Sequence, residues 1–208
     1  TQGVVSVPGE YINIASADDS ETLTLYGIRT DAAVNHGNSG GGLFNEMGEL
    51  AGVVYARSDE EDIVGFGYAI PANRALLIAQ NVIDNAPYSQ GAAVASLGVT
   101  VYTYASRAVF NGTTGKTYLE EKVVVRGLSG AGTAAKMGLD VNDTLVSARI
   151  ERGGQTVLSA ALTRTYQLGE MMYAVRLGDT LHITVSRGGQ TQEYSCTFSS
   201  VTDFAQGG

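Results

Sequence analysis

The chain opens with short apolar runs separated by turn-forming residues. Residues 3–70 hold five runs rich in Val, Ile, Leu and Tyr, divided by Gly, Asp, Asn and Ser: VVSV, EYINI, TLTLYGI, ELAGVVYA and VGFGYAI. Such runs are typical of β-strands, and several at this spacing predict a barrel or a sandwich. After Pro71 the apolar residues recur every three or four positions, which predicts an amphipathic helix over 71–84. We expect this helix to close a first domain.

The pattern beyond residue 95 alternates strands with two short helices. Two Gly-Gly turns, at 153–154 and 188–189, are each flanked by strand-like runs and predict hairpins. The expected helices are Thr133–Met137 and Thr165–Arg176, and further strands are expected at 97–104 and 122–128. The order β-β-α-β-β-α-β-β describes a small α+β domain. The fold class is therefore mainly β, with an α+β second domain.

Charge and composition divide the chain at about the same place. Residues 1–90 carry 3 basic and 12 acidic residues, 3 − 12 = −9, whereas residues 91–208 carry 10 − 9 = +1. We expect a first domain at 1–85, a linker at 86–95, a second domain at 96–200 and a loose tail at 201–208. The acidic first half argues against nucleic acid as a partner, and no apolar run is long enough to span a membrane.

One serine stands among glycines in NHGNSGGGLFN, residues 35–45. A serine hydroxyl becomes a nucleophile only with a base to take its proton and donors for the oxyanion that forms. Glycines allow a turn sharp enough to aim two backbone N–H groups at one point. Gly37 and Ser39 would supply those groups, with the Ser39 hydroxyl beside them. On this motif alone, an ordinary Gly-rich turn explains the sequence equally well.

The wider context distinguishes these readings. The stretch TDAAVNHGNSGGGLFNEMGELAGVVYA, followed by VGFGYAIP, resembles the HtrA family of trypsin-like serine proteases over residues 30–71. The opening TQGVVS is similar to the strand that starts the second barrel of the protease in that family. The resemblance implies a partial trypsin-like β-barrel at 1–85, and a parent protein that is a serine endopeptidase of protein quality control, acting on unfolded or damaged proteins.

The resemblance also implies a role for individual residues. Ser39 would be the nucleophile, and Gly37 and Ser39 would form the oxyanion hole. Val34 and Asn35 would line the specificity pocket, which suggests a preference for small or aliphatic side chains. A substrate strand would pair with Val53, Val54 and Tyr55. Gly42 stands where the family usually has Pro or Ala, and this departure is expected to loosen the loop.

The partners of the serine are not evident in the sequence. The only histidines are His36, too close to Ser39 along the loop to act as an oriented base, and His182 in the second domain. Asp31 reads as a structural loop carboxylate, and the acidic run 58–62 reads as a solvated loop, not a calcium site. We expect the catalytic His and Asp to come from a missing N-terminal barrel of the same protein, so that this chain alone is inactive. A pseudoprotease or peptide-binding scaffold, or a fragment that assembles with itself, remains an alternative.

The second domain resembles a PDZ domain. ASLGV, residues 95–99, is similar to the carboxylate-binding loop of that family, and residues 125–148 to its central segment. The resemblance implies that a peptide C-terminus binds the N–H groups of Leu97, Gly98 and Val99, and that its strand pairs with residues 99–104. A domain that only packs against the protease is the alternative. Asn142 stands in place of the usual Gly, and Asn tolerates a left-handed conformation.

The expected partners are unfolded proteins and peptide C-termini, with a homo-oligomer possible. No cofactor and no metal is expected. Relatives imply an extracytoplasmic protein, periplasmic or at the cell surface, anchored to the membrane by an N-terminal segment absent from this sequence.

Overall fold

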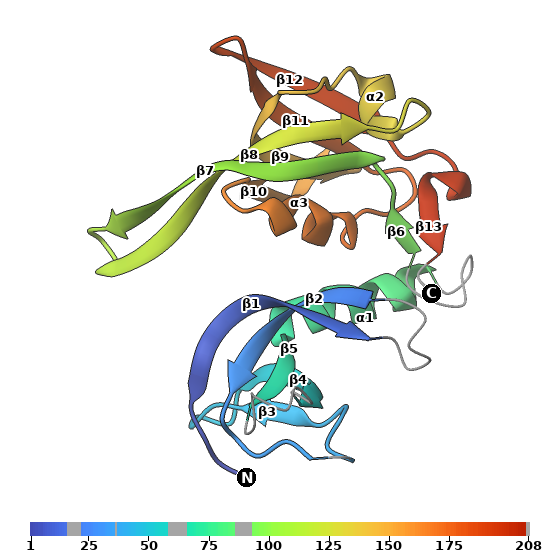
Figure 1. Ribbon diagram of the computed structural model, residues 1–208. Coiled ribbons are helices and arrows are strands. Elements are labelled where there is room, and N and C mark those ends of the chain that lie inside the picture. The colour runs from blue at the N-terminus through green and yellow to red at the C-terminus, as the bar shows by residue number, and fades with distance from the viewer. Residues whose placement is uncertain (16–21, 36, 58–65, 86–92, 207–208) are drawn as a thin grey trace. The chain divides into compact units, whose positions relative to one another are not determined.

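The computed structural model describes residues 1–15, 22–35, 37–57, 66–85 and 93–206 (Figure 1). These residues form two compact units, Thr1–Leu77 and Ile78–Gly208, and each is described by itself. His36 and the acidic run 58–62 lie outside the described residues, as do residues 86–92 of the expected linker. In the described part of the chain, no helix has the length and apolar character needed to cross a membrane.

The first unit is an antiparallel five-stranded sheet. Its strands lie in the order β1-β2-β5-β4-β3. Their bounds are β1 Val5–Ala15, β2 Thr22–Thr30, β3 Gly42–Phe44, β4 Leu50–Arg57 and β5 Gly67–Pro71. The two runs predicted at the start of the chain form one strand, β1, which bulges between Val5 and Glu10. The sheet therefore has two outer strands, β1 and β3.

The hydrophobic core of this unit is small. Among its described residues only Ile28, Ala32, Val54 and Ala69 are buried and apolar. Larger apolar side chains on its strands and turns are exposed, including Phe44 at 60% and Met47 at 79%. Contiguous exposed apolar surface usually marks an interaction site.

Helix α1, Ala72–Asn85, confirms the predicted helix but buries a different face. The boundary between the units falls within it, between Leu77 and Ile78. Its buried residues are Asn81 and Asn85, whereas Leu76 and Ile83 of the apolar stripe are about two-thirds exposed, at 64% and 66%. The apolar stripe therefore predicted the helix correctly but not its buried face. That face carries Asn81, whose side chain is hydrogen-bonded.

The second unit has a six-stranded antiparallel sheet and two short helices. The main path of the sheet is β12-β11-β9-β8-β7, and β10 pairs with β9. The strands are β7 Val99–Asn111, β8 Lys116–Leu128, β9 Thr144–Arg152, β10 Gln155–Ala161, β11 Thr180–Arg187 and β12 Gln190–Thr197. Helices α2, Thr133–Met137, and α3, Thr165–Met172, accompany the sheet. A single core of mostly aliphatic side chains includes Val125, Ile150, Leu181 and Phe198.

Two segments differ from the expected linker and tail. Residues Ala93–Ala95 form strand β6, and Phe204–Gln206 form β13, which pairs with it after a 3₁₀ turn at Val201–Asp203. The Phe204 ring lies 5.8 Å from the ring of buried Phe198. Strand pairing with β6 and the contact between the two rings therefore hold the described part of the tail in place.

Helix α3 is shorter than predicted. It ends at Met172, and the N–H groups of Tyr173 and Ala174 bond three residues back, to Glu170 and Met171. The Arg176 N–H instead donates to the side chain of Asp179, at 2.8 Å. A buried carboxylate thus replaces the helical acceptor and turns the chain toward β11.

Asn81 joins three elements of the second unit. It is fully buried, at 0% exposure. Its amide nitrogen donates to the carbonyls of Ala93 and Tyr173, at 2.9 and 2.8 Å, and its oxygen accepts from the Ala93 N–H at 2.9 Å. This one side chain ties α1 to β6 and to the end of α3.

We predict that Asn81→Ala lowers the free energy of unfolding of the second unit by about 3 kcal/mol, because it leaves several buried polar groups without a partner. Urea unfolding followed by circular dichroism measures the change. The neighbouring exposed Gln80, which bonds to Asp84, is the matched control. Gln80→Ala should cost about 0.5 kcal/mol or less, and equal losses in both variants would contradict the role of Asn81.

Asp143 holds the turn before β9. Its carboxylate is 1% exposed and accepts from Arg187 Nε and Nη2, at 2.6 and 2.7 Å, and from the Asp140 N–H at 2.8 Å. Asn142 beside it has φ 74°, the left-handed conformation expected from its sequence position. Burial alone would raise the pKa of the Asp143 carboxyl. The bonds from Arg187 and Asp140 outweigh burial and hold that pKa below its ordinary value.

A lowered pKa makes this contribution to stability pH-dependent. It is complete above the ordinary aspartate pKa of about 3.9 and is lost as pH falls through the lower pKa of the folded state. We predict that Asp143→Asn is less stable than the parent at pH 7, and that the difference shrinks toward about pH 2. Unfolding curves across this range provide the test, and a constant difference would contradict it.

Candidate functional site

The Ser39 loop is built from two tight turns. The Asn38 N–H donates to the Asn35 carbonyl at 3.0 Å, and the Gly41 N–H donates to the Asn38 carbonyl at 2.9 Å. Gly37 and Gly40 have φ of 94° and 87°, values that strain a side-chain-bearing residue. Two of the glycines are therefore required by the backbone conformation.

Strand β4 fixes the loop from one side. The Gly40 N–H donates to the Val54 carbonyl and the Val54 N–H to the Gly41 carbonyl, each at 2.8 Å. The Ser39 hydroxyl is exposed and donates to the Tyr55 carbonyl at 3.1 Å. The serine thus sits at the tip of a loop held by reciprocal backbone bonds.

The same bonds orient the Ser39 amide. In the described residues every peptide bond is trans, so the N–H of a residue points opposite to the preceding carbonyl. The Asn38 carbonyl points into the turn, toward the Gly41 N–H. The Ser39 N–H therefore points out of the turn, where it can donate to a group outside the chain.

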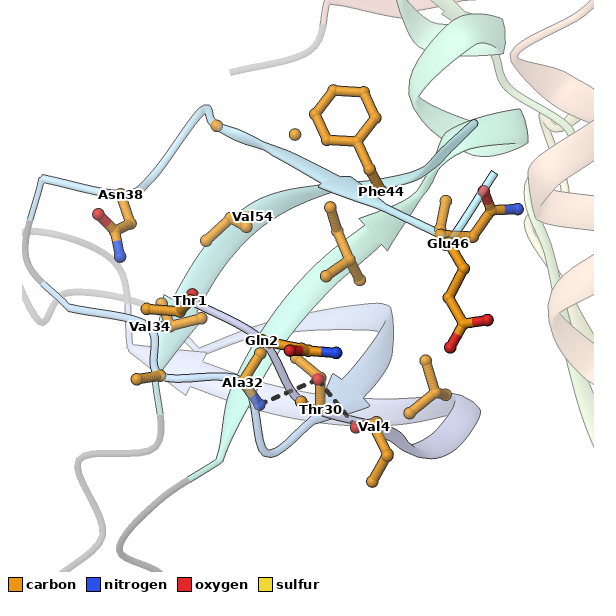
Figure 2. A pocket seen from close by; sticks show the side chains of 18 of the residues that line it. Thr1, Gln2, Val4, Thr30, Ala32, Val34, Asn38, Phe44, Glu46 and Val54 are labelled. Atoms are coloured by element: carbon orange, nitrogen blue, oxygen red, sulfur yellow. Dashed lines mark hydrogen bonds between the residues drawn. The ribbon is translucent and has the colours of Figure 1, made fainter. Parts of the chain in front are cut away.

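Val34 packs against the sheet. A Cβ at Gly67 of β5 would overlap the Val34 side chain, so the glycine makes room for it. Val34 also lines a cavity of about 820 Å³ together with Gly37 and Asn38 (Figure 2). Ser39 and Asn35 are not among the described residues that line this cavity.

The cavity lies between the two outer strands of the first unit. Its walls include Val4 and Val5 at the start of β1 and Leu43 and Phe44 of β3. Figure 2 shows Phe44 and Glu46 on one side of the space and Thr1, Gln2 and Val4 on the other. The cavity is therefore lined by polar residues such as Gln2 and Glu46 as well as by apolar ones.

Thr30 and Asp31 hold the start of β1, a role that the sequence pattern did not reveal for Thr30. The Thr30 hydroxyl donates to the Val4 carbonyl at 2.9 Å and accepts from the Ala32 N–H at 3.1 Å (Figure 2). The Asp31 carboxylate accepts from the Val4 N–H at 2.6 Å. This bond agrees with the expectation of a structural carboxylate.

Gly42, the departure from the family pattern, has a packing reason. It begins β3 opposite Val53, and a Cβ there would overlap the Phe44 ring and approach Leu50 to 3.0 Å. The missing side chain lets the aromatic ring lie over the strand.

Val53, Val54 and Tyr55 lie in β4, between β3 and β5. Both backbone groups of Val54 already bond to the serine loop. The Tyr55 carbonyl accepts the Ser39 hydroxyl, a bond that can be exchanged for one with a ligand. Burial raises the pKa of the Tyr55 phenol. An added substrate strand would therefore have to use groups other than those of Val54.

His182 belongs to the second unit and is held by charged neighbours. Its side chain is 15% exposed and lies on β11 beside Arg149 and Glu193. Its Nδ1 is 3.1 Å from Arg149 Nη2 and 3.4 Å from Glu193. These contacts fix the ring as part of an ion cluster on the outer face of the sheet.

The loop Leu97–Val99 is held in the same way as the Ser39 loop, by hydrogen bonds to its carbonyl groups. Leu97 is buried, and its carbonyl accepts from the Ala134 N–H of α2, while the Gly98 carbonyl accepts from the Ser129 N–H, both at 2.8 Å. Since both peptide units are trans, the N–H groups of Gly98 and Val99 point away from α2 and Ser129.

Gly98 is required in this loop. It has φ 65°, and a Cβ there would lie 3.0 Å from both Gly132 and Ser129. A Cβ at Gly132 would in turn lie 2.9 Å from the Leu97 carbonyl oxygen. The segment SGAG, residues 129–132, is the sequence signal for this close approach.

Comparisons with known proteins find similar sequences and similar structures. No family model matches the chain. It is 28% identical over 197 residues to the serine protease Do-like HtrA of Lactobacillus helveticus, covering 91% of this chain and 43% of that protein. It is 28% identical over 212 residues to the probable periplasmic serine endoprotease DegP-like of Pseudomonas savastanoi pv. phaseolicola, covering 99% of this chain and 38% of that protein.

A solved structure described as the HtrA-type protease AlgW with decapeptide superimposes with a TM-score of 0.52 at 25% identity, covering 86% of this chain and 56% of that one. The chain spans less than half the length of the two curated relatives above. Similarity extends over nearly all of its 208 residues, and the proteins to which the chain is similar are HtrA/DegP-like serine proteases.

Proposed function

We propose that Ser39 is the nucleophile of a serine endopeptidase that acts on unfolded or damaged proteins. The observation that carries the proposal is the loop tied to β4, which presents the Ser39 hydroxyl and turns the Ser39 amide outward. The Gly37 and Ser39 N–H groups would stabilise the oxyanion. Val34 and Asn35 would bind the substrate side chain, and the backbone beside Val53–Tyr55 would guide its strand.

The general base would come from outside these 208 residues. His182 is engaged with Arg149 in the second unit, and the nearest described partner of the Ser39 hydroxyl is a carbonyl, which cannot take its proton. The cavity between β1 and β3 and the exposed Phe44 and Met47 give a protease barrel a surface on which to pack. The greater length of the relatives supports this proposal.

The second unit is proposed to be a PDZ-like domain that binds peptide C-termini. The outward N–H groups of Gly98 and Val99 are suited to a carboxylate, and β7 can accept a further strand. A relative named periplasmic and an HtrA-type protease solved with a decapeptide support a peptide-binding protein that works outside the cytoplasm.

A peptide-binding scaffold without catalysis is the second candidate. The bond from the Ser39 hydroxyl to the Tyr55 carbonyl favours it, because this bond leaves the oxygen unactivated.

For the 208-residue chain alone we predict no rapid, stoichiometric reaction of Ser39 with a fluorophosphonate probe. Loss of the triad base slows serine chemistry on the order of 10⁶-fold. Intact-mass spectrometry measures the labelling, with Ser39→Ala and an active trypsin-like protease as controls. Labelling within minutes that Ser39→Ala abolishes would show a base within the chain. If Ser39 also fails to react with the probe in the full-length protein, the second candidate, a scaffold without catalysis, replaces the proposal of a protease.

For the second unit we predict that a peptide with a free C-terminal carboxylate binds roughly ten- to a hundredfold more tightly than its C-terminal amide, since charged hydrogen bonds are lost. Fluorescence anisotropy with the 208-residue chain measures both. Gly98→Ala, which strains the loop, should weaken the carboxylate peptide and leave the amide nearly unchanged. Equal affinity for both peptides would contradict the role of Leu97–Val99.

A further inference from the structure

The hairpin of β7 and β8 extends beyond the rest of the second unit. Its strands have 13 residues each, and Figure 1 shows the hairpin projecting from the sheet. β8 pairs with β9 only at Val124 and Thr144, so residues 105–122, here called the arm, form a two-stranded ribbon in the described structure. The neighbouring Tyr104 and the arm residue Phe110 are each 67% exposed. An isolated ribbon of this kind is marginal in water and gains from a partner.

The base of the arm is anchored. The Glu121 N–H donates to the Thr163 carbonyl at 2.7 Å, and the Glu121 carboxylate accepts from the Thr165 N–H at the start of α3, at 3.1 Å. These two bonds attach the base of the arm to the start of α3.

Among the described residues, no strand pairs with the outer edge of β7. β7 is the last strand on the path of the sheet and pairs only with β8, from Val99 opposite Leu128 to Asn111 opposite Lys116. On either side of an irregularity at Tyr104, alternate backbone N–H and C=O groups of β7 therefore face outward without a strand partner among the described residues. This edge begins at the Leu97–Val99 loop and runs out along the arm.

The edge is much longer than the groove beside the helix. With eight residues, α3 is about 12 Å long, which matches about four residues of an extended peptide. With 13 residues, β7 extends about 40 Å. An added strand antiparallel to β7, with its C-terminus at Gly98, runs upstream toward Asn111 and reaches the arm after its last few residues.

The charged side chains of the arm indicate which charge the upstream segment of the ligand should carry. Its two carboxylates are engaged, Glu120 by Arg107 at 2.6 Å and Glu121 by the Thr165 N–H. Lys116 is exposed at the tip, and Lys122 lies over the Tyr104 ring, 5.4 Å from its centroid. The side chains left to meet a ligand are therefore cationic and aromatic.

We propose that β7 and the arm together bind an extended, acidic polypeptide segment that lies directly upstream of the captured C-terminus. The inference rests on the proposed peptide-binding function and adds the length and charge of the ligand. The continuity of the β7 edge with the carboxylate loop and the positive charge of the arm carry it. Recognition extends over about a dozen residues rather than the last four.

The test uses the 208-residue chain and fluorescent peptides that share their last four residues. A peptide of twelve residues with an acidic upstream segment should bind about tenfold more tightly than the tetrapeptide. The same peptide with a basic upstream segment should gain nothing. Lys116→Glu should lower the gain of the acidic peptide about threefold or more, with the tetrapeptide unaffected.

Lys136→Glu is the matched control. It makes the same change of charge at an exposed position of α2, away from the arm, and should preserve the ratio of long- to short-peptide affinity. N-methylation of alternate upstream amides tests strand pairing itself. Methyl groups at one parity should abolish the gain, because those amides face β7, and methyl groups at the other parity should not.

The outcomes separate the two proposals. Binding of the tetrapeptide with no gain from the acidic extension overturns the role of the arm and leaves the carboxylate site standing. The role of the arm is also overturned if N-methylation of either alternate set of upstream amides lowers the gain in affinity equally. If the long peptide binds as an amide as well as an acid and Lys116→Glu weakens both, the arm stands and the carboxylate site falls. Peptide-independent dimers that Lys116→Glu dissolves would assign the arm to a second copy and overturn the proposal.

Discussion

Hydrogen bonding of strand edges is the constraint on which both units of this chain depend. A backbone N–H or C=O without a partner is costly when water is excluded. In the first unit, Val54 meets this constraint for the serine loop by bonding to Gly40 and Gly41, and that exchange positions Ser39. In the second unit, the same constraint turns the Leu97 and Gly98 carbonyls inward and their neighbouring amides outward. Outer strands such as β1, β3 and β7 leave an edge to which a further strand could in principle be added.

Local sequence predicted the elements whose causes are local. The change of apolar period after Pro71 located α1, and two Gly-Gly pairs located the hairpins of β9–β10 and β11–β12, because positive φ at these turns is a property of glycine itself. The Gly-Asn-Ser-Gly-Gly motif likewise predicted a sharp loop around Ser39. Its glycines fit the observed turns for the same steric reason.

Features that depend on distant partners could not be predicted in this way. Residues 93–95 and 204–206 look like linker and tail because each is too short to be a strand until the other lies beside it. Helix α3 stops early because Asp179, seven residues beyond its end, captures the Arg176 amide. Pairing between strands also produces the bond from Ser39 to the Tyr55 carbonyl and the length of the β7–β8 arm. Neither can be predicted from one stretch of sequence alone.

Helix α1 changes where the chain can be divided. The sequence places the division after the helix, yet its second half carries Asn81 and Asp84, whose side chains bond to Tyr173 and Arg176 near the end of α3. A truncated chain that starts at residue 86 would lack both side chains. The Ala93 and Tyr173 carbonyls would lose the Asn81 amide, and Arg176 would lose the Asp84 carboxylate. The boundary between the units lies within a continuous helix, between Leu77 and Ile78, so the second unit cannot be excised without dividing α1.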